Sequence, residues 1–188
     1  SSDLGVQALN AQGLALAYHD KSDGGLFAVL AEMMIASRSG LTVTLDAAAD
    51  AFGVLFNEEL GAVVQVRRAD VAKARDAFAG LPVHEIATLR DDGKLVIEQG
   101  GKVILDEARQ ALHAAWSATS IEIQRLRDNP DCADAEFDRV FDDGDVGLTP
   151  RVLFDATVNV AAPMIATGSR PKVAILREQG VNSQIETG

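Results

Sequence analysis

The sequence predicts an α+β fold in which strands and helices alternate before the chain enters a meander and then a long helix. Residues 26–34 are apolar around most of a helix, which must therefore be covered by a sheet. Residues 41–45 alternate apolar and polar side chains, which is the pattern of a half-buried strand. Two glycine turns between apolar runs, Asp92-Gly93 and Gly100-Gly101, predict two consecutive hairpins.

The other elements follow from apolar spacing and from residues that end helices. In the first part of the chain we expect a helix over 3–12, a strand over 14–18 and a helix over 26–38. This last helix would be closed by Arg38 and by a C′ glycine at Gly40. We then expect a strand over 41–45, a short helix ending at Phe56, a strand over 61–67, a helix over 69–79 and a strand over 83–90. Apolar side chains at spacings of three and four from Leu105 to Leu126 predict a long amphipathic helix, which Asn129-Pro130 ends.

The part of the chain beyond this helix is expected to connect two domains. Residues 128–145 hold eight acidic side chains and one arginine, which is typical of a solvated connection. Because residues 128–170 show little periodicity, we interpret them as an extended linker. Residues 172–176 then predict a strand and residues 178–182 a turn. One strand and one turn cannot fold alone, so the chain is expected to end inside a second domain.

Composition and charge disfavour several classes of protein. The net charge of −11 disfavours DNA or RNA as a general partner, because phosphate backbones attract basic surfaces. The single cysteine, Cys132, excludes an internal disulfide and lies among acids that disfavour a reactive thiolate. No apolar run is long enough to span a membrane, and the first residues lack the pattern of a signal peptide. We therefore expect a soluble, cytoplasmic protein.

The string HDKSDGG at 19–25 has the chemistry of a site for a nucleotide and a metal ion. A glycine turn that leads into a helix presents unpaired N–H groups and the positive end of the helix dipole to a phosphate. Asp20 and Asp23 offer oxygen ligands to Mg²⁺, and the Ser22 hydroxyl suits the phosphate or the metal. The same residues also suit ordinary turn chemistry, with Asp23 as a helix N-cap and Asp20 in an Asx turn. Taken alone, the string favours this structural interpretation.

Four separated strings together resemble one family of enzymes. They are AYHDKSDGGLFAVLAEM at 17–33, LFNEELGAVVQVR at 55–67, QRLRDNPDCAD at 124–134 and AAPMIATGSRPKVAILREQGVNSQIE at 161–186. The chain is similar over nearly its whole length to the large, single-chain formylglycinamidine ribonucleotide synthetases (phosphoribosylformylglycinamidine synthases) of purine biosynthesis. HD-x-SDGG alone indicates only the wider superfamily of aminoimidazole ribonucleotide synthetase-like proteins. Its combination with RPKVAILREQGVN, which resembles the opening strand of a glutamine amidotransferase, is far more specific.

This resemblance implies a division into parts and a reaction. Residues 1–105 would form a synthetase-like C-terminal domain with a mixed sheet covered by helices, from the second such repeat of the family. Residues 106–170 would form the long helix and acidic linker, and residues 171–188 the first strand of a truncated α/β glutaminase domain. The implied ligase uses ATP to convert formylglycinamide ribonucleotide and glutamine to formylglycinamidine ribonucleotide, glutamate, ADP and phosphate. The implied partners are the missing first repeat and glutaminase, with no nucleic acid and no membrane.

The resemblance also implies site residues. Asp20 corresponds to a magnesium ligand and Ser22 to a contact with ATP or ADP. The second repeat of this family is associated with an auxiliary nucleotide site that looks structural, so we interpret the pair as half of that site. Glu58 and Glu59 are left open between a substrate or metal contact and a solvated loop. No catalytic residue is expected, because the chain has no nucleophilic cysteine in a glutaminase elbow, and the fragment alone is predicted to be inactive.

Two other functions stay open beside the ligase. One is a free-standing small-molecule kinase or synthetase of the same superfamily, although such an enzyme has no need for the C-terminal extension. The other is a non-catalytic interaction module in which the SDGG turn merely caps a helix. His84 and His113 lack partners at metal-ligand spacing, so surface or helix-face roles are expected. A fragment should also expose apolar surface on residues 1–105, where the missing repeat would pair.

Overall fold

The structure is a computed structural model that describes residues 2–168, 170, 172–177, 183 and 185. It divides into two compact units, residues 1–145 and residues 146–188. The first unit contains both sheets, and the second contains the short helix α7 (Ala162–Ala166). The functional division expected near residues 105 and 170 stays a prediction.

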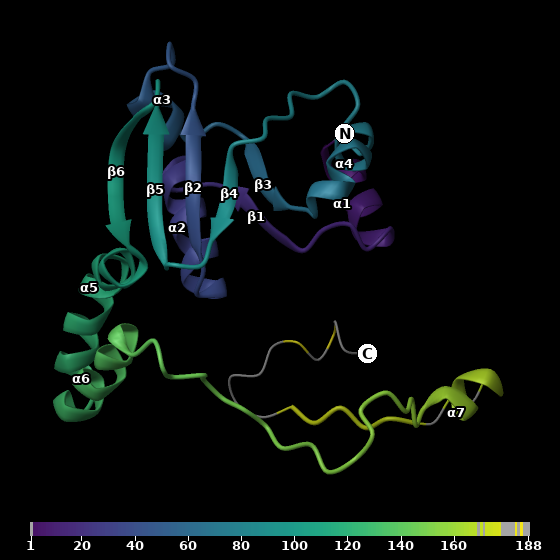
Figure 1. Cartoon of the computed structure of the whole chain (residues 1–188). Coiled ribbons are helices and arrows are strands. Elements are labelled where there is room, and N and C mark those ends of the chain that lie inside the picture. Colours follow the sequence, from purple (N-terminus) through teal and green to yellow (C-terminus); the bar gives the residue numbers. More distant parts are fainter. Residues whose placement is uncertain (1, 169, 171, 178–182, 184, 186–188) are drawn as a thin grey trace. The chain divides into compact units, whose positions relative to one another are not determined.

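The larger sheet has four strands, in the order β4 (Ala87–Arg90), β2 (Gly40–Leu45), β5 (Lys94–Gln99) and β6 (Lys102–Ala108), as Figure 1 shows. β2 is antiparallel to β4 and parallel to β5, and β5 is antiparallel to β6. The sheet is therefore mixed, as the resemblance implies. The Gly100-Gly101 turn joins β5 to β6 and confirms the second predicted hairpin.

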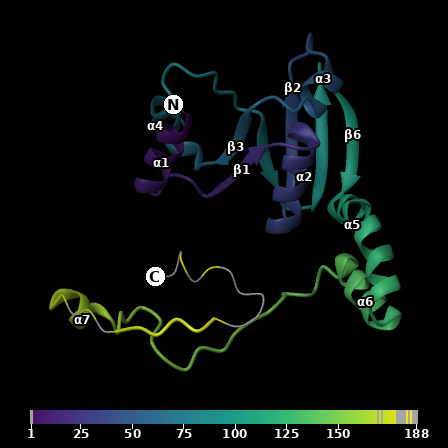
Figure 2. The same ribbon diagram turned by 180° about the vertical axis from the view of Figure 1, so that it is seen from behind.

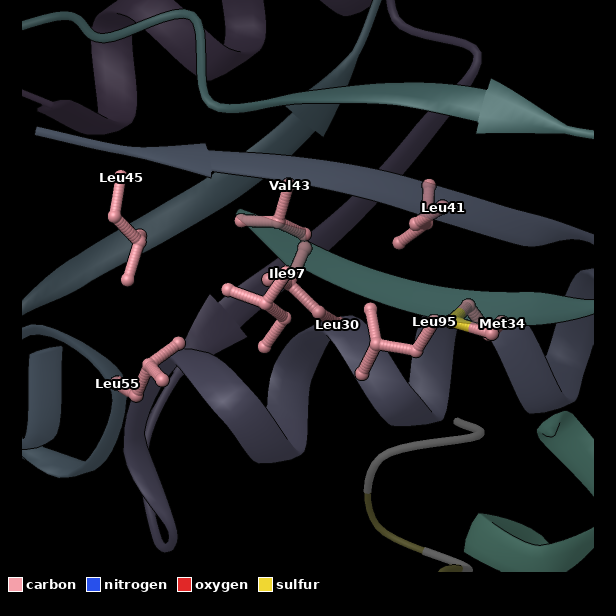
Figure 3. Packing of buried hydrophobic residues seen from close by; sticks show 8 residues of the cluster. All are labelled: Leu30, Met34, Leu41, Val43, Leu45, Leu55, Leu95 and Ile97. Carbon is pink, nitrogen blue, oxygen red and sulfur yellow. The ribbon is translucent and has the colours of Figure 1, made fainter. Parts of the chain in front are cut away.

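Helix α2 (Gly25–Ser37) covers one face of this sheet and closes the main core. β2 buries alternate residues, which confirms the half-buried strand predicted from its sequence. Each fully buried leucine or isoleucine contributes about 1.5–3 kcal/mol, so this cluster stabilises the packing of the helix on the sheet. Figure 3 shows its members, which come from α2, β2, β5 and α3 (Ala51–Phe56): Leu30, Met34, Leu41, Val43, Leu45, Leu55, Leu95 and Ile97.

A smaller sheet pairs β1 (Ala17–Lys21) with β3 (Gly61–Gln65) in antiparallel fashion. The neighbouring helices α1 (Ser2–Ala11) and α4 (Val71–Ala77) lie side by side, as Figure 2 shows. Between these elements is a second core, built on Leu9, Leu14 and Ala74. The remaining elements of the first unit are η1 (Arg68–Asp70), α5 (Arg109–Arg127), α6 (Pro130–Asp138) and η2 (Arg139–Phe141).

The Asp92-Gly93 turn does not form the hairpin that the sequence predicts. It joins β4 to β5, and β2 lies between these two strands in the sheet. A Cβ atom on Gly40, the first residue of β2, would lie 2.7 Å from the backbone N and O atoms of Lys94. Gly40 is therefore required by this close approach and is not a C′ glycine, because α2 ends at Ser37 and its C-cap residue Arg38 is itself left-handed with φ 53°.

The first strand begins and ends later than predicted. The expectation was residues 14–18, whereas β1 runs from Ala17 to Lys21 and includes His19 and Asp20. Its position is set by pairing with β3, in which Lys21 lies opposite Gly61. Leu14 is instead buried in the second core. The strand expected over 83–90 is likewise shorter, because only Ala87–Arg90 pair with β2.

The acidic segment is partly helical, which contradicts an extended linker over residues 130–141. Asn129 caps α6, since its side chain accepts hydrogen bonds from the N–H groups of Asp131 and Cys132, and Pro130 follows in the first turn. Asn-Pro ends α5 and at the same time begins the next helix. An ion pair between Arg125 and Asp134 joins the two helices, with 2.5 Å between Nε and Oδ1.

The strand predicted over 172–176 is wrong for this structure. Residues 172–177 have no regular secondary structure, and no strand among the described residues pairs with them. An isolated strand has no partner for its backbone N–H and C=O groups, which explains its absence. The turn expected over 178–182 lies outside the described residues.

Candidate functional site

The two sequence strings that suggest a site are brought together by the smaller sheet. Lys21 at the end of β1 pairs with Gly61 at the start of β3. The turn of residues 22–24 and the loop of residues 57–60 adjoin these two ends. The Lys21 Nζ atom also donates to the Asn57 side-chain oxygen at 3.4 Å. HDKSDGG and NEELG are thus two sides of one local structure (Figure 1).

Both glycines of the turn are required by its geometry. Gly24 and Gly25 have φ values of 80° and 68°, which L side chains rarely adopt. A Cβ atom on Gly25 would lie 2.8 Å from the carbonyl oxygens of Leu55 and Asn57. The Gly25 N–H donates to the Ser22 carbonyl at 3.0 Å and closes the turn. Gly25 therefore serves the contact between α2 and the end of α3, whereas a Cβ atom on Gly24 would lie 2.8 Å from the Ala28 Cβ atom of α2.

Glu58 lies at the N-terminus of α2, where an anion is favoured. Its Oε1 atom accepts a hydrogen bond from the Gly24 N–H at 3.0 Å. Gly24 is the N-cap residue of α2, which makes no side-chain capping bond, so the suggestion of Asp23 as N-cap is wrong. A carboxylate here complements the positive end of the helix dipole. The Glu58 side chain thus has a defined partner and is not merely part of a solvated loop.

Asp20 and Ser22 are both accessible to a ligand. Asp20 lies on the exposed face of β1, its side chain is 71% exposed, and its carboxylate is 3.9 Å from the His19 Nδ1 atom. Ser22 is exposed in the turn that follows. Neither the Asx turn at Asp20 nor any other side-chain hydrogen bond of Asp20 is present within the described residues.

The donor set fits only part of a magnesium site. Within the part of the chain that the structure describes, no three His, Cys, Asp or Glu side chains are grouped so that they could hold a metal ion. Mg²⁺ keeps several waters and is commonly bound by one or two carboxylates together with substrate phosphates. Asp20 therefore suits one ligand position of a magnesium ion that phosphate and groups from elsewhere also bind.

A second interaction, which the sequence analysis missed, stabilises the strand that carries Asp20. Glu32 on α2 lies with Oε2 2.8 Å from the His19 Nε2 atom and accepts a hydrogen bond from Trp116 Nε1 on α5 at 2.9 Å. The His19 Nδ1 atom donates to the Asp20 carbonyl at 2.8 Å. The available signal was that Glu32 is the only charge inside an otherwise apolar helix. Through these two contacts, Glu32 connects β1, α2 and α5.

The comparison with known sequences identifies the family. The profile of the AIR synthase related protein, C-terminal domain, matches residues 4–99, which is more than half of the chain. The chain belongs to the AIR synthase related protein family. The matched residues contain both site strings and the whole smaller sheet, together with β2, β4 and β5.

Solved structures support the same fold for this AIR synthase related domain. PurL from Thermotoga maritima complexed with ATP is similar with a TM-score of 0.53 and 17% identity, over 57% of this chain and 20% of that one. PurL from Thermotoga maritima complexed with FGAR has a TM-score of 0.51 and 18% identity, over 57% of this chain and 19% of that one. Phosphoribosylformylglycinamidine synthase II from Thermotoga maritima has a TM-score of 0.51 and 18% identity, over 57% of this chain and 20% of that one. The chain spans about a fifth of the length of these proteins.

The remaining predictions concern which side chains are exposed at the surface. His84 and Cys132 are exposed. In the described residues no helix is both long and apolar enough to cross a membrane. The exposed apolar side chains expected on residues 1–105 are present, and Phe52 and Leu60 are 77% and 101% exposed.

Proposed function

We propose that this chain is part of a formylglycinamidine ribonucleotide synthetase, the ATP-dependent ligase of purine biosynthesis. The observation that carries the proposal is the HDKSDGG string in a domain of the AIR synthase related family, joined to the string RPKVAILREQGVN of glutaminase type. PurL structures of the same fold were obtained with ATP and with FGAR, which supports a nucleotide and formylglycinamide ribonucleotide as ligands.

Within this enzyme, the chain contributes half of a site for Mg²⁺ and ATP or ADP. Asp20 supplies one carboxylate to the metal, and the Ser22 hydroxyl contacts a phosphate oxygen. Both groups are exposed, which supports a pocket whose other wall comes from the missing part of the polypeptide. We assign the site to the auxiliary, structural nucleotide, because the strings of this chain resemble the second repeat of the family, which is associated with that nucleotide.

The reaction requires ammonia from glutamine, and the chain carries only the beginning of the expected glutaminase. We infer that the glutaminase and the first repeat of the same polypeptide are its partners, and that the fragment by itself does not form the amidine. Glu58 binds the Gly24 N–H and so supports the turn beside the nucleotide. It is a positioning residue in this proposal and not a metal ligand.

The proposal is tested on the intact enzyme that contains this chain. Mg-ADP affinity, thermal stability and amidine formation are measured for Asp20→Asn and Ser22→Ala, with Asp91→Asn on the β4–β5 connection as the matched control. Loss of one charge-assisted contact weakens binding about tenfold. We expect Asp20→Asn to lose Mg-ADP affinity and stability while kcat changes by no more than about twofold, and Asp91→Asn to behave as wild type.

The outcomes separate the parts of the proposal. If affinity and stability stay unchanged in Asp20→Asn, the assignment of this half-site is wrong. If kcat falls while stability is kept, the site belongs to turnover and not to structure. If the intact protein phosphorylates a small molecule without using glutamine, the ligase assignment is replaced by the free-standing kinase of the same superfamily.

A further inference from the structure

A cavity of about 370 Å³ lies between the C-terminal half of α2, α5, α6 and η2, in a different part of the first unit from the SDGG turn. α5 and α6 lie side by side in both views of the molecule (Figure 1 and Figure 2). The volume is within the range of small-molecule sites, about 300–1,000 Å³. The cavity is lined by three arginines, Arg38 at the C-cap of α2, Arg109 on α5 and Arg139 on η2.

Arg109 is the most constrained of these arginines, since only 3% of the residue is exposed. A buried guanidinium is costly unless an anion and hydrogen-bond acceptors satisfy it. Its anionic partner is Asp143, whose side chain is 66% exposed. Gln110 donates to the other oxygen of the same carboxylate. The charge of Arg109 is thus balanced by an exposed residue.

The other two arginines converge on the same turn, residues 142–145. Arg139 contacts the Asp145 Oδ2 atom from Nη2 at 2.6 Å and from Nε at 2.8 Å. Arg38 donates to the Asp145 carbonyl, and its Nη2 atom is 3.9 Å from Oδ2. Two carboxylates of one short turn therefore pair with three arginines, which leaves one positive charge in excess. This acidic turn ends at the boundary of the first unit, since residue 146 begins the second.

His113 also lines the cavity and carries a buried polar atom without a partner in the described part of the chain. Its Nδ1 atom is buried and has no hydrogen-bond partner, the one such side-chain atom among the described residues. A buried polar atom without a partner is uncommon and is usually met by a water or ligand. His113 lines the same cavity as the three arginines, with Trp116 beside it at 6.2 Å between ring centroids.

We propose that this cavity binds a small anion with a phosphate or carboxylate group, and that the acidic turn 142–145 occupies the same arginines as a built-in competitor. When an anion displaces Asp143 and Asp145, the wall retains three arginines and one carboxylate, that of Glu136. Arginine binds carboxylates and phosphates in the same forked geometry, which makes the exchange possible. Binding thereby releases the turn that leads into residues 146–188.

The chain offers a direct reporter of binding, because Trp116 is its only tryptophan and lines the cavity. Trp116 fluorescence of the 188-residue chain is followed while inorganic phosphate, pyrophosphate or citrate is added at constant ionic strength. Constant ionic strength is needed because salt screens exposed charges. Saturation by phosphate and pyrophosphate alone indicates a phosphate site, and saturation by citrate alone a carboxylate site.

Matched variants separate this site from general attraction of anions. Asp143→Asn removes the competing carboxylate and is expected to tighten anion binding at least threefold. Arg139→Gln, at a side chain that is 61% exposed and so is not needed for packing, is expected to weaken binding at least fivefold. Arg127→Gln is the control, because Arg127 lies on α5, is 71% exposed, pairs with Asp128 and does not line the cavity.

Three results overturn the proposal. The first is a fluorescence signal that does not saturate with any of the three anions, even in Asp143→Asn. The second is equal loss of affinity in Arg127→Gln and Arg139→Gln, which indicates unspecific charge effects. The third is unchanged affinity in Asp143→Asn, which shows that the acidic turn does not compete. Circular dichroism of each variant checks that its helices are intact.

Discussion

The Glu58 carboxylate accepts a hydrogen bond from the Gly24 N–H at 3.0 Å, across 34 positions of sequence. This contact joins the loop after α3 to the first turn of α2, where the helix lacks a side-chain cap of its own. A carboxylate at a helix N-terminus satisfies an unpaired donor and interacts favourably with the dipole. The site turn therefore depends on a residue from another string for its conformation.

Removal of the Glu58 carboxylate should destabilise the fold modestly. We expect Glu58→Ala to lower the free energy of unfolding by about 0.5–1 kcal/mol, since Gly24 loses its acceptor but regains water. Urea denaturation measures this value. Glu59→Ala is the control, because only its backbone N–H is bonded, to the Asn57 side chain at 2.6 Å. A loss in Glu59→Ala as large as in Glu58→Ala would contradict the capping role.

A methyl group on Gly25 should be far more damaging than one on a glycine in open space. Gly25→Ala combines a φ of 68° with contacts of 2.8 Å to the backbone of residues 55–57, and should cost about 2–5 kcal/mol. In Gly13→Ala, where φ is 63° and no atom lies within 4 Å of the added Cβ atom, only the cost of the left-handed backbone remains, about 1–2 kcal/mol. Thermal or urea unfolding of both variants gives the difference. Equal losses would show that α2 can move away from α3.

The elements that the sequence predicted well are those whose pattern is local. α2 follows from its continuous apolar run, β2 from its alternation, and the Gly100-Gly101 hairpin from its turn residues. The Asp92-Gly93 turn carries the same local signal, yet β2 occupies the position between its two strands. A turn sequence specifies backbone angles but not which strand becomes the neighbour. Strand order depends on packing against α2, which no short pattern contains.

The sequence indicated the turn that carries Asp20 and Ser22 but not the contacts around it. The glycine pair was assigned to a turn, whereas the close approach of Gly25 to residues 55–57 requires the fold to bring α3 beside α2. His19 and Asp20 were placed in a turn because polar residues are not typical of a buried strand. Both belong to β1, because they pair with β3. The bonds of Glu32 to His19 and Trp116 depend on three elements, so only a lone charge in an apolar helix could have indicated them.

The Arg90 guanidinium should control the protonation of Asp92 on the β4–β5 connection. Its hydrogen bond to the carboxylate is the largest cause that lowers the pKa of Asp92 from 3.8 to about 2, and Thr42 orients the guanidinium through a bond of 3.1 Å. We expect Arg90→Gln to raise this pKa toward 3.8, although the Lys94 N–H still donates to the carboxylate. Carboxyl NMR titration measures it. Arg75→Gln, far from this pair in sequence, should leave it unchanged.

The buried Nδ1 atom of His113 predicts a loss of stability in mild acid. Burial, and then the charges of Arg109 and Arg38, lower the pKa of His113 below 6.5 in the folded state. Between that lowered pKa and 6.5 the unfolded chain binds more protons than the folded one, so the free energy of unfolding falls as pH decreases through this window. Above pH 6.5 the imidazole is neutral in both states and contributes no pH dependence.

The experiment compares His113→Gln, which cannot be protonated, with the wild type by urea denaturation between pH 5 and 8. We expect the wild type to lose stability more steeply below about pH 6.5 than the variant, because only the wild type must charge a group beside two arginines. His84→Gln is the control, since His84 is exposed. Parallel curves for the wild type and His113→Gln would show that solvent reaches the ring, and that its Nδ1 atom is satisfied by water at every pH. Added phosphate should also flatten the wild-type curve if an anion beside Arg109 and Arg38 offsets their charge on the imidazole, which connects this measurement to the proposed cavity site.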